Sequence, residues 1–202
     1  STMRQISCSR PFTPSPLHPF AHSLLFVGRI YPVKAIDRII TAFQMVPHEG
    51  WTLRIVGPDQ SGYMSELEKI AGADVVFVGP KYGDDLAAEY ANCECAILAS
   101  HTENFGATIV DAMAHAKPVI TGTKTPWKIV AERRCGWWVD NDVETLADAI
   151  REMMALSDAA RAEMGARGRK LVEEKYTWSA VAKEMRVGYG ELVGRKGERV
   201  KG

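Results

Sequence analysis

The sequence predicts an α/β fold: a Rossmann-like, doubly wound parallel sheet of about six strands with helices on both faces, followed by C-terminal helices. Short apolar runs of strand length alternate with segments that have helical periodicity. The apolar runs lack the polar alternation of half-exposed strands, as is typical of parallel strands covered on both faces. Repeated alternation of strand and helix in one chain indicates a layered α/β domain.

Six apolar runs are the expected strands, at 24–28, 52–56, 75–78, 95–99, 118–121 and 136–139. Between and after them, apolar residues recur three or four positions apart and predict amphipathic helices. The expected buried stripes are Ile36, Ile39, Ile40 and Phe43; Leu67, Ile70 and Ala71; Leu86, Tyr90 and Cys93; Ile109, Val110, Met113 and Ala114; and Val143, Leu146, Ala147, Ile150 and Met154.

The chain divides by composition into three parts. Residues 1–23 hold four prolines and little apolar pattern, which indicates a linker or expression remnant. Residues 24–165 carry the strand–helix alternation and form the expected Rossmann-like domain. Residues 166–202 contain two charged helical stretches, 166–175 and 178–193, too polar for a core of their own. We expect them to pack on this domain or on a partner domain.

Composition narrows the possible classes of protein. Lysine plus arginine and aspartate plus glutamate each number 25, and this balance argues against a general nucleic-acid binder. No apolar run approaches the ~18 residues of a membrane span, and the start lacks the pattern of a signal peptide. We expect the four cysteines, Cys8, Cys93, Cys95 and Cys135, to be free thiols in a reducing cytoplasm.

Two cations follow the first expected strand, where such sheets bind ligands. Gly28 allows a sharp turn, and Arg29 and Lys34 follow within one loop. Taken alone, the pair is more often a solvated surface feature than a phosphate site. The segment is neither a dinucleotide fingerprint nor a Walker loop.

The stretch after the fourth expected strand carries the most chemistry. A helix is expected to begin near Gly106, where unsatisfied N–H groups of its first turn favour an anion. Glu103 precedes this helix and Asp111 lies within it; eight helical residues would separate them by about 12 Å. One carboxylate could then meet a sugar and the other a ribose across a diphosphate. The alternative is a helix cap for Glu103 and a solvated face for Asp111.

Several linked segments resemble the C-terminal domain of family-four retaining glycosyltransferases, whose GT-B architecture has two facing Rossmann-like domains. The similarity covers roughly residues 24–185. The matching segments, in order, are Phe26-Val27-Gly28-Arg29 with Lys34, Arg54-Ile55-Val56-Gly57, Val76-Phe77-Val78-Gly79, Glu103-Asn104-Phe105-Gly106 with Asp111-Ala112-Met113-Ala114, Pro118-Val119-Ile120, and Gly136-Trp137-Trp138-Val139.

The resemblance implies a role for each matched position. Glu103 looks like the catalytic first acid of the E-x7-E motif, beside the donor sugar with Asn104. The donor diphosphate would be bound by Arg29 and Lys34 and by the segment Phe105, Gly106 and Ala107. Asp111 stands where the family usually has a second glutamate at the ribose. The nucleobase would lie near Gly79, Pro80 and Lys81.

Two departures from the family pattern replace glycine by alanine, at Ala35 and Ala116. An alanine in a left-handed helix cap would be mildly strained. The segment Thr125-Pro126-Trp127, with 101–104 and Trp137-Trp138, resembles members that build lipopolysaccharide or other surface polysaccharides. A plain helix start explains two of its residues, with Thr125 as N-cap and Pro126 first in the helix.

Asp140-Asn141-Asp142 is a D-x-D sequence, which binds metal in the other glycosyltransferase architecture. It directly precedes an expected helix, with Glu144 placed for a capping box, so capping is the favoured interpretation. The resemblance implies no metal or other cofactor, since cations and a helix N-terminus can stabilise a leaving diphosphate.

The expected function is the donor-binding half of a glycosyltransferase of hexosyltransferase type, acting on a nucleoside diphosphate sugar (UDP, GDP or ADP) and a glycan or lipid-linked acceptor. The expected partners are this donor and a missing N-terminal acceptor domain, with no nucleic acid. The whole protein would be peripheral at the inner face of the membrane, and this fragment alone would be inactive. The alternatives are a nucleotide-sugar 2-epimerase-like enzyme and a non-enzymatic nucleotide-binding module.

Overall fold

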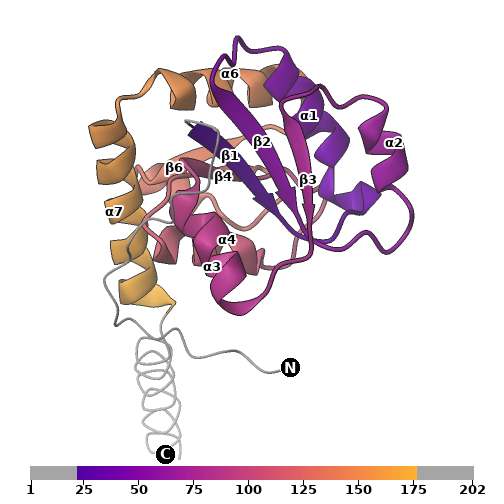
Figure 1. Ribbon diagram of the computed structural model, residues 1–202. Helices are drawn as coiled ribbons and strands as arrows, with labels where there is room; N and C mark the ends of the chain where they lie inside the picture. Colours follow the sequence, from indigo (N-terminus) through magenta and orange to yellow (C-terminus); the bar gives the residue numbers. More distant parts are fainter. Residues whose placement is uncertain (1–21, 177–202) are drawn as a thin grey trace, which may run out of the picture.

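The computed structural model describes residues 22–176. Most of the expected linker (residues 1–21), Cys8 and the expected helix at 178–193 lie outside this range. The last two residues of the expected linker, His22 and Ser23, instead belong to the first strand. Six parallel strands form one sheet in the order β3-β2-β1-β4-β5-β6, which confirms the predicted fold class (Figure 1). The strands are β1 (His22–Val27), β2 (Trp51–Val56), β3 (Val75–Gly79), β4 (Cys95–Leu98), β5 (Val119–Gly122) and β6 (Gly136–Val139).

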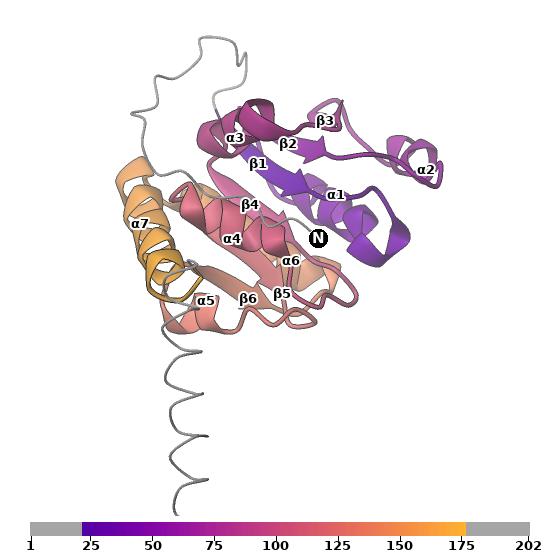
Figure 2. The same ribbon diagram turned by 90° about the horizontal axis from the view of Figure 1, so that it is seen from below.

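Helices connect the strands and cover both faces of the sheet. They are α1 (Ile36–Gln44), α2 (Met64–Glu68), α3 (Gly83–Asn92), α4 (Ala107–Ala114), α5 (Ile129–Glu132), α6 (Val143–Ala155) and α7 (Asp158–Lys175), with a short 3-10 helix η1 (Pro32–Lys34) before α1. α1 packs beside α6 and α4 beside α7. Figures 1 and 2 place α1 and α6 on one face and α3 and α4 on the other.

The core confirms the periodicity of the sequence. β4 and β5 are buried along their whole length, as expected for strands between two helical layers. The α1 stripe of Ile36, Ile39, Ile40 and Phe43 is fully buried. Ile70 is an exception: it lies beyond the end of α2 and is exposed. The five-residue α2 ends before its stripe can turn Ile70 inward.

The expected boundary between residues 165 and 166 falls inside α7, which is one continuous helix. Gly165 and Gly168 let this helix approach the sheet domain. A Cβ on Gly165 would lie 1.8 Å from the Ala116 carbonyl oxygen, and one on Gly168 would lie 3.1 Å from Met113 Cγ. Since the glycines permit this approach, α7 packs as part of the same domain.

A polar cluster holds the start of α7 to the amino edge of the sheet. Arg161 is buried, forms ion pairs with Glu94 and Asp158, and lies with its guanidinium 5.4 Å from the centroid of the Trp51 ring. Its guanidinium also donates to the Leu156 carbonyl, at 2.5 Å. A buried charge needs several partners to offset its desolvation. Arg161 has them only when the start of α7 lies against the amino edge of the sheet, so it holds the helix in that position.

Candidate functional site

The strand order reverses between β1 and β4, and the carboxyl ends of these two strands are the position where open α/β sheets form a crevice, the name used below for this region. On either side of this point the connections run in opposite directions, so the loops after β1 and β4 diverge at the carboxyl edge of the sheet. Arg29 and Lys34 follow β1, and Glu103 to Ala107 follow β4. The topology therefore brings the two predicted segments to the same switch point.

Glycines allow the backbone at this edge to pack closely. A Cβ on Gly57 would lie 1.8 Å from the Gly28 carbonyl oxygen, so the loops after β1 and β2 touch through their backbones. The Gly57 N–H donates to the Gly79 carbonyl at 3.0 Å. That carbonyl, in the predicted base region, is already engaged. The neighbouring Pro80 is exposed and Lys81 is half-buried.

Lys34 and Glu103 meet directly across the crevice. Lys34 Nζ lies 2.5 Å from Glu103 Oε2, and the Ser100 hydroxyl donates to the same oxygen at 3.3 Å. The His101 N–H donates to the Val33 carbonyl at 2.8 Å, which ties the two loops together beside the pair. Glu103 therefore holds the lysine charge close to the start of α4.

Arg29 differs from Lys34. Its side chain is exposed, and within residues 22–176 it makes no hydrogen bond or ion pair. The structure therefore provides one fixed cation at the crevice and one that is free to reorient.

The start of α4 is a helix N-terminus without a side-chain cap. Gly106 is the N-cap, in the left-handed region at φ 71°, and α4 begins at Ala107. In the part of the chain that the structure describes, no acceptor lies within hydrogen-bonding distance of the N–H groups of Gly106, Ala107 and Thr108. These donors and the positive end of the helix dipole favour an anion. Asn104 beside them is exposed, without a hydrogen bond to residues 22–176.

The loop before α4 corrects the expected spacing of the two carboxylates. Glu103 to Gly106 is not helical, and the span from Ala107 to Asp111 rises only about 6 Å along the axis. The expectation of about 12 Å along a helix is therefore wrong. Glu103 instead bends towards the tip, with its Cγ 3.2 Å from where a Cβ on Gly106 would lie.

Asp111 lies one turn into α4, on the side that faces α3. Burial raises its pKa above the ordinary value because the charged form is desolvated, and His115 lowers it in part. Burial, and next the charge of Asp111, raise the pKa of Tyr90, whose ring stacks on His115. Asp111 is thus a half-buried carboxylate rather than a fully solvated one.

Of the two expected helix caps, the one at Thr125 is wrong and the one at Asp142 is confirmed. Thr125 is not an N-cap: its hydroxyl and N–H both bond to the Gly122 carbonyl in a turn, and α5 begins only at Ile129. Pro126 is therefore not the first residue of a helix. Asp142 does cap α6, accepting from the Thr145 N–H at 2.8 Å. Glu144 lies one position too early for a capping box.

The sequence does not predict the contacts that three supporting residues make. Trp127 is buried, and its indole N–H donates to the Phe105 carbonyl. Asn141, inside the D-x-D sequence, donates through its amide to the carbonyls of Ala99 and Ser100. Ser100 reaches Glu103. Most of these contacts join segments that are far apart in sequence, and such contacts cannot be predicted from local periodicity.

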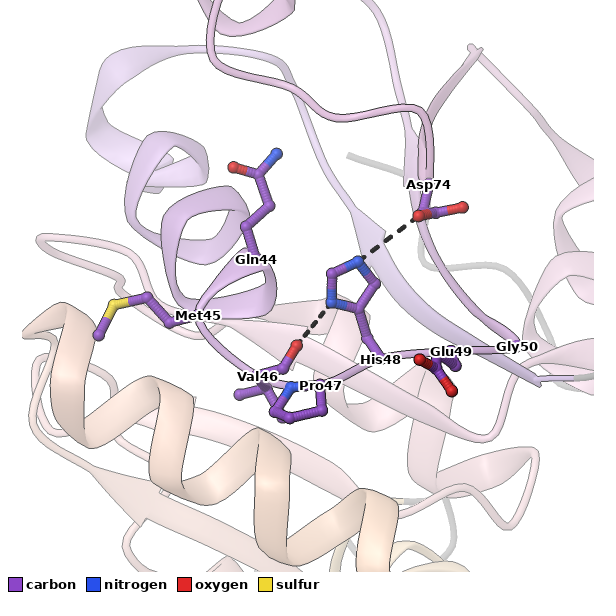
Figure 3. Close-up of a pocket in the computed structure, with 8 residues that line it drawn as sticks. All are labelled: Gln44, Met45, Val46, Pro47, His48, Glu49, Gly50 and Asp74. Carbon is purple, nitrogen blue, oxygen red and sulfur yellow. Dashed lines mark hydrogen bonds and ion pairs between the residues drawn. The ribbon is translucent and has the colours of Figure 1, made fainter.

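Another hollow lies at the opposite edge of the sheet (Figure 3). It is lined by residues 44–50, just before β2, and by Asp74, just before β3. His48 contacts both the Val46 carbonyl and Asp74, at 2.6 and 3.5 Å. Because it lies at the amino ends of the strands, this hollow is separate from the crevice.

The fold is that of a Rossmann-like α/β domain with its switch point between β1 and β4. The family model described as glycosyl transferases group 1 matches residues 21–171. The chain belongs to this family and corresponds to the C-terminal domain of its GT-B architecture.

The relatives agree with this assignment. A D-inositol 3-phosphate glycosyltransferase of Salinispora tropica is 32% identical over 187 residues, which cover 83% of this chain and 38% of that protein. The sucrose-phosphate synthase of Thermosynechococcus elongatus has a TM-score of 0.73 at 26% identity, covering 86% of this chain and 46% of its own. The Anabaena protein HepE, solved with UDP and glucose, has a TM-score of 0.73 at 20% identity, covering 83% and 48%. This chain thus spans less than half of each.

Proposed function

We propose that this chain is the donor-binding half of a retaining glycosyltransferase of hexosyltransferase type, which transfers a sugar from a nucleoside diphosphate sugar to a glycan or lipid-linked acceptor. One observation carries the proposal: the free N–H groups at the tip of α4 lie beside the Lys34–Glu103 pair at the switch point of the sheet. Membership of the family supports this use of the crevice.

In the proposed complex the diphosphate lies against the tip of α4. It accepts from the N–H groups of Phe105, Gly106 and Ala107 and from Lys34. Lys34 is already neutralised by Glu103, so the attraction for a diphosphate comes mainly from Arg29 and the helix tip. As the diphosphate takes over Lys34, Glu103 becomes free to accept from sugar hydroxyls beside Asn104.

The nucleoside is proposed to lie along α4 towards α3. Asp111 would accept from the ribose hydroxyls, and the segment Gly79, Pro80 and Lys81 would face the base. Because the Gly79 carbonyl is engaged by Gly57, base contacts would come from the remaining backbone groups. UDP is favoured over GDP and ADP because the HepE structure contains UDP.

Negative charge grows on the diphosphate as the bond from the anomeric carbon to the phosphate oxygen breaks. Oriented N–H groups and cations stabilise such charge without reorganisation, which is the main source of catalysis in this proposal. No metal is required in it. Within residues 22–176, the side chains that could share an ion are His22, Glu94 and Asp158. They lie at the amino edge, where Arg161 already pairs with both carboxylates.

The remaining parts of the proposal concern the whole protein. An N-terminal domain would hold the acceptor, so this chain alone would bind donor weakly and turn over nothing. The motif around Thr125-Pro126-Trp127 favours lipopolysaccharide or another surface polysaccharide as the product. A cytoplasmic protein, peripheral at the inner face of the membrane, suits such an acceptor. None of the helices within residues 22–176 is long and apolar enough to cross a membrane.

The test uses the whole protein with a radiolabelled UDP-sugar and a lipid-linked acceptor. Glu103→Ala should lower kcat by about a hundredfold or more, as for the loss of a transition-state contact, and the anomeric configuration of the product should match that of the donor. Glu132→Ala, which removes an exposed partner of Lys128, is the control. No transfer by the wild-type protein would favour a nucleotide-binding module, full activity of Glu103→Ala would remove Glu103 from the reaction, and an inverted product would exclude retention.

A further inference from the structure

We propose that Trp127 is a positioning residue for the donor diphosphate, which it orients through the Phe105–Gly106 peptide. The inference rests on the proposed function, because it concerns how the tip of α4 is aimed. Trp127 lies in the loop between β5 and α5 and is 22 positions from Phe105 in sequence. The side chain is 1% exposed, so it contacts the site from inside the domain.

One hydrogen bond carries the argument. The Trp127 indole Nε1 lies 2.5 Å from the Phe105 carbonyl oxygen. A trans peptide is planar, and its C=O and N–H groups point in opposite directions. Because the indole holds the carbonyl towards the interior, the N–H of Gly106 points away from Trp127. The contact therefore sets the direction of the first donor of the tip, on the side away from Trp127, where we place the phosphates.

The surroundings of Trp127 hold the indole in place. Its ring forms a cluster with those of Phe105 and Tyr176, at centroid distances of 5.6 and 5.3 Å, and those two rings lie 6.2 Å from each other. The loop that carries it is fixed at Thr125, whose carbonyl accepts from the Trp138 indole at 3.4 Å. The indole also crowds the tip, since a Cβ on Gly106 would lie 3.2 Å from Trp127 Nε1. An anchored donor of this kind restricts rotation of the Phe105–Gly106 peptide.

Loss of the indole N–H has a specific consequence. The Phe105 carbonyl would lose its partner and could turn towards water at the crevice, which would rotate the Gly106 N–H inwards. Phosphate contacts would then weaken, whereas the proposed contacts to ribose and base lie elsewhere and would not. A purely structural role predicts equal weakening for all ligands.

The experiment compares Trp127→Phe with the matched control Trp137→Phe in the 202-residue chain. The control also removes one indole N–H, which donates to the exposed Glu152. UDP and uridine are titrated by NMR, with GDP and ADP and their nucleosides as further arms. We expect Trp127→Phe to raise the Kd of the diphosphate about tenfold while the Kd of the nucleoside changes less than twofold. The control should change neither.

Equal Kd values for wild type and Trp127→Phe would overturn the role of Trp127 and leave the proposed function standing. An equal rise for diphosphate and nucleoside would also overturn it. If wild type binds none of the nucleotides, the proposed function fails and this role fails with it.

A measurement on the wild-type chain covers the case in which Trp127→Phe does not fold. The Trp127 indole proton should exchange slowly with D2O, and UDP should shift the Gly106 amide more than the Ile109 amide, which already donates to the Gly106 carbonyl. Exchange of the indole proton within seconds, or UDP binding that leaves the Gly106 amide unshifted, would contradict the proposal.

Discussion

Lys34 and Glu103 form an ion pair between the loops that follow β1 and β4, with 2.5 Å between Nζ and Oε2 and 15% of each side chain exposed. The pair fixes a cation beside the tip of α4 but cancels its charge. A donor diphosphate must therefore compete with Glu103 for Lys34, and this competition leads to the first prediction.

Glu103→Gln should tighten the binding of UDP to this chain by about threefold to tenfold. The amide keeps the shape of the side chain but leaves the Lys34 charge uncompensated at the tip, where a phosphate gains from it. Isothermal titration would measure the change, with Glu132→Gln as an exposed control. Weaker binding of UDP by Glu103→Gln would show that Lys34 does not face the diphosphate.

Gly106→Ala should abolish UDP binding and destabilise the domain by about 2–3 kcal/mol, the sum of backbone strain and crowding. Gly106 has φ 71°, and a Cβ there would lie 3.0 Å from Leu98 Cδ2. Gly50→Ala is the matched control, because Gly50 has φ 78° but open space around it. Urea unfolding should show that Gly50→Ala lowers the free energy of unfolding by about 1 kcal/mol, with UDP binding unchanged. Normal UDP binding by Gly106→Ala would contradict the anion site at the tip.

Asp111→Asn should stabilise the chain at pH 7 and weaken UDP binding. Burial raises the pKa of Asp111, so its contribution to stability is fully present below the unfolded pKa and is lost as pH rises through the folded pKa. An asparagine avoids that loss, so the melting temperature of the variant should exceed that of wild type by up to about 3 °C. This difference in melting temperature should become smaller towards pH 4.

Thermal unfolding between pH 4 and 8 measures this effect, with the exposed Asp148→Asn as control. A variant less stable than wild type at pH 7 would show that the carboxylate is favourably solvated. Unchanged UDP affinity would remove Asp111 from the ribose site.

Ala116→Gly should stabilise the chain by about 0.5–1 kcal/mol, since glycine relieves the left-handed strain at a small entropic cost. Ala116 has φ 55°, and Ala35 has φ 51°, so the strain expected at Ala116 from the sequence has its structural basis. Ala131→Gly, in the right-handed α5, should instead destabilise by up to about 1 kcal/mol. Urea midpoints of the two variants should move in opposite directions, and a common direction would contradict the assignment of strain.

Local patterns in the sequence predict the sheet because its strands are continuous apolar runs. β4 and β5 have no polar residue facing water, so each appears in the sequence as an uninterrupted, mostly apolar run that clearly indicates a buried strand. The order of the strands also brings the segments after β1 and β4 together, as the fold class requires. The start of α4 at Ala107 agrees with the expected start near Gly106.

What the sequence did not predict depends on long-range contacts or on short elements. In the sequence, Trp127 belongs to a segment that resembles members building surface polysaccharides, and nothing there indicates that its indole bonds to Phe105 across the domain. In the sequence, Asn141 belongs to a segment interpreted as a helix cap or a metal motif. In the structure, its side-chain amide donates to the Ala99 carbonyl just after β4. Thr125 and Pro126 were misplaced because α5 has only four residues, too few for a clear period.

The most direct test of the central claim is an NMR titration of this chain with UDP, GDP and ADP, repeated with Arg29→Ala. The account predicts binding of at least one of them at millimolar or lower concentration, with the largest amide shifts at Gly106 and Ala107. Arg29→Ala should weaken that binding about fivefold or more, because Arg29 supplies an uncancelled charge at the crevice. No binding of any of the three, or shifts confined to the hollow around His48, would contradict it.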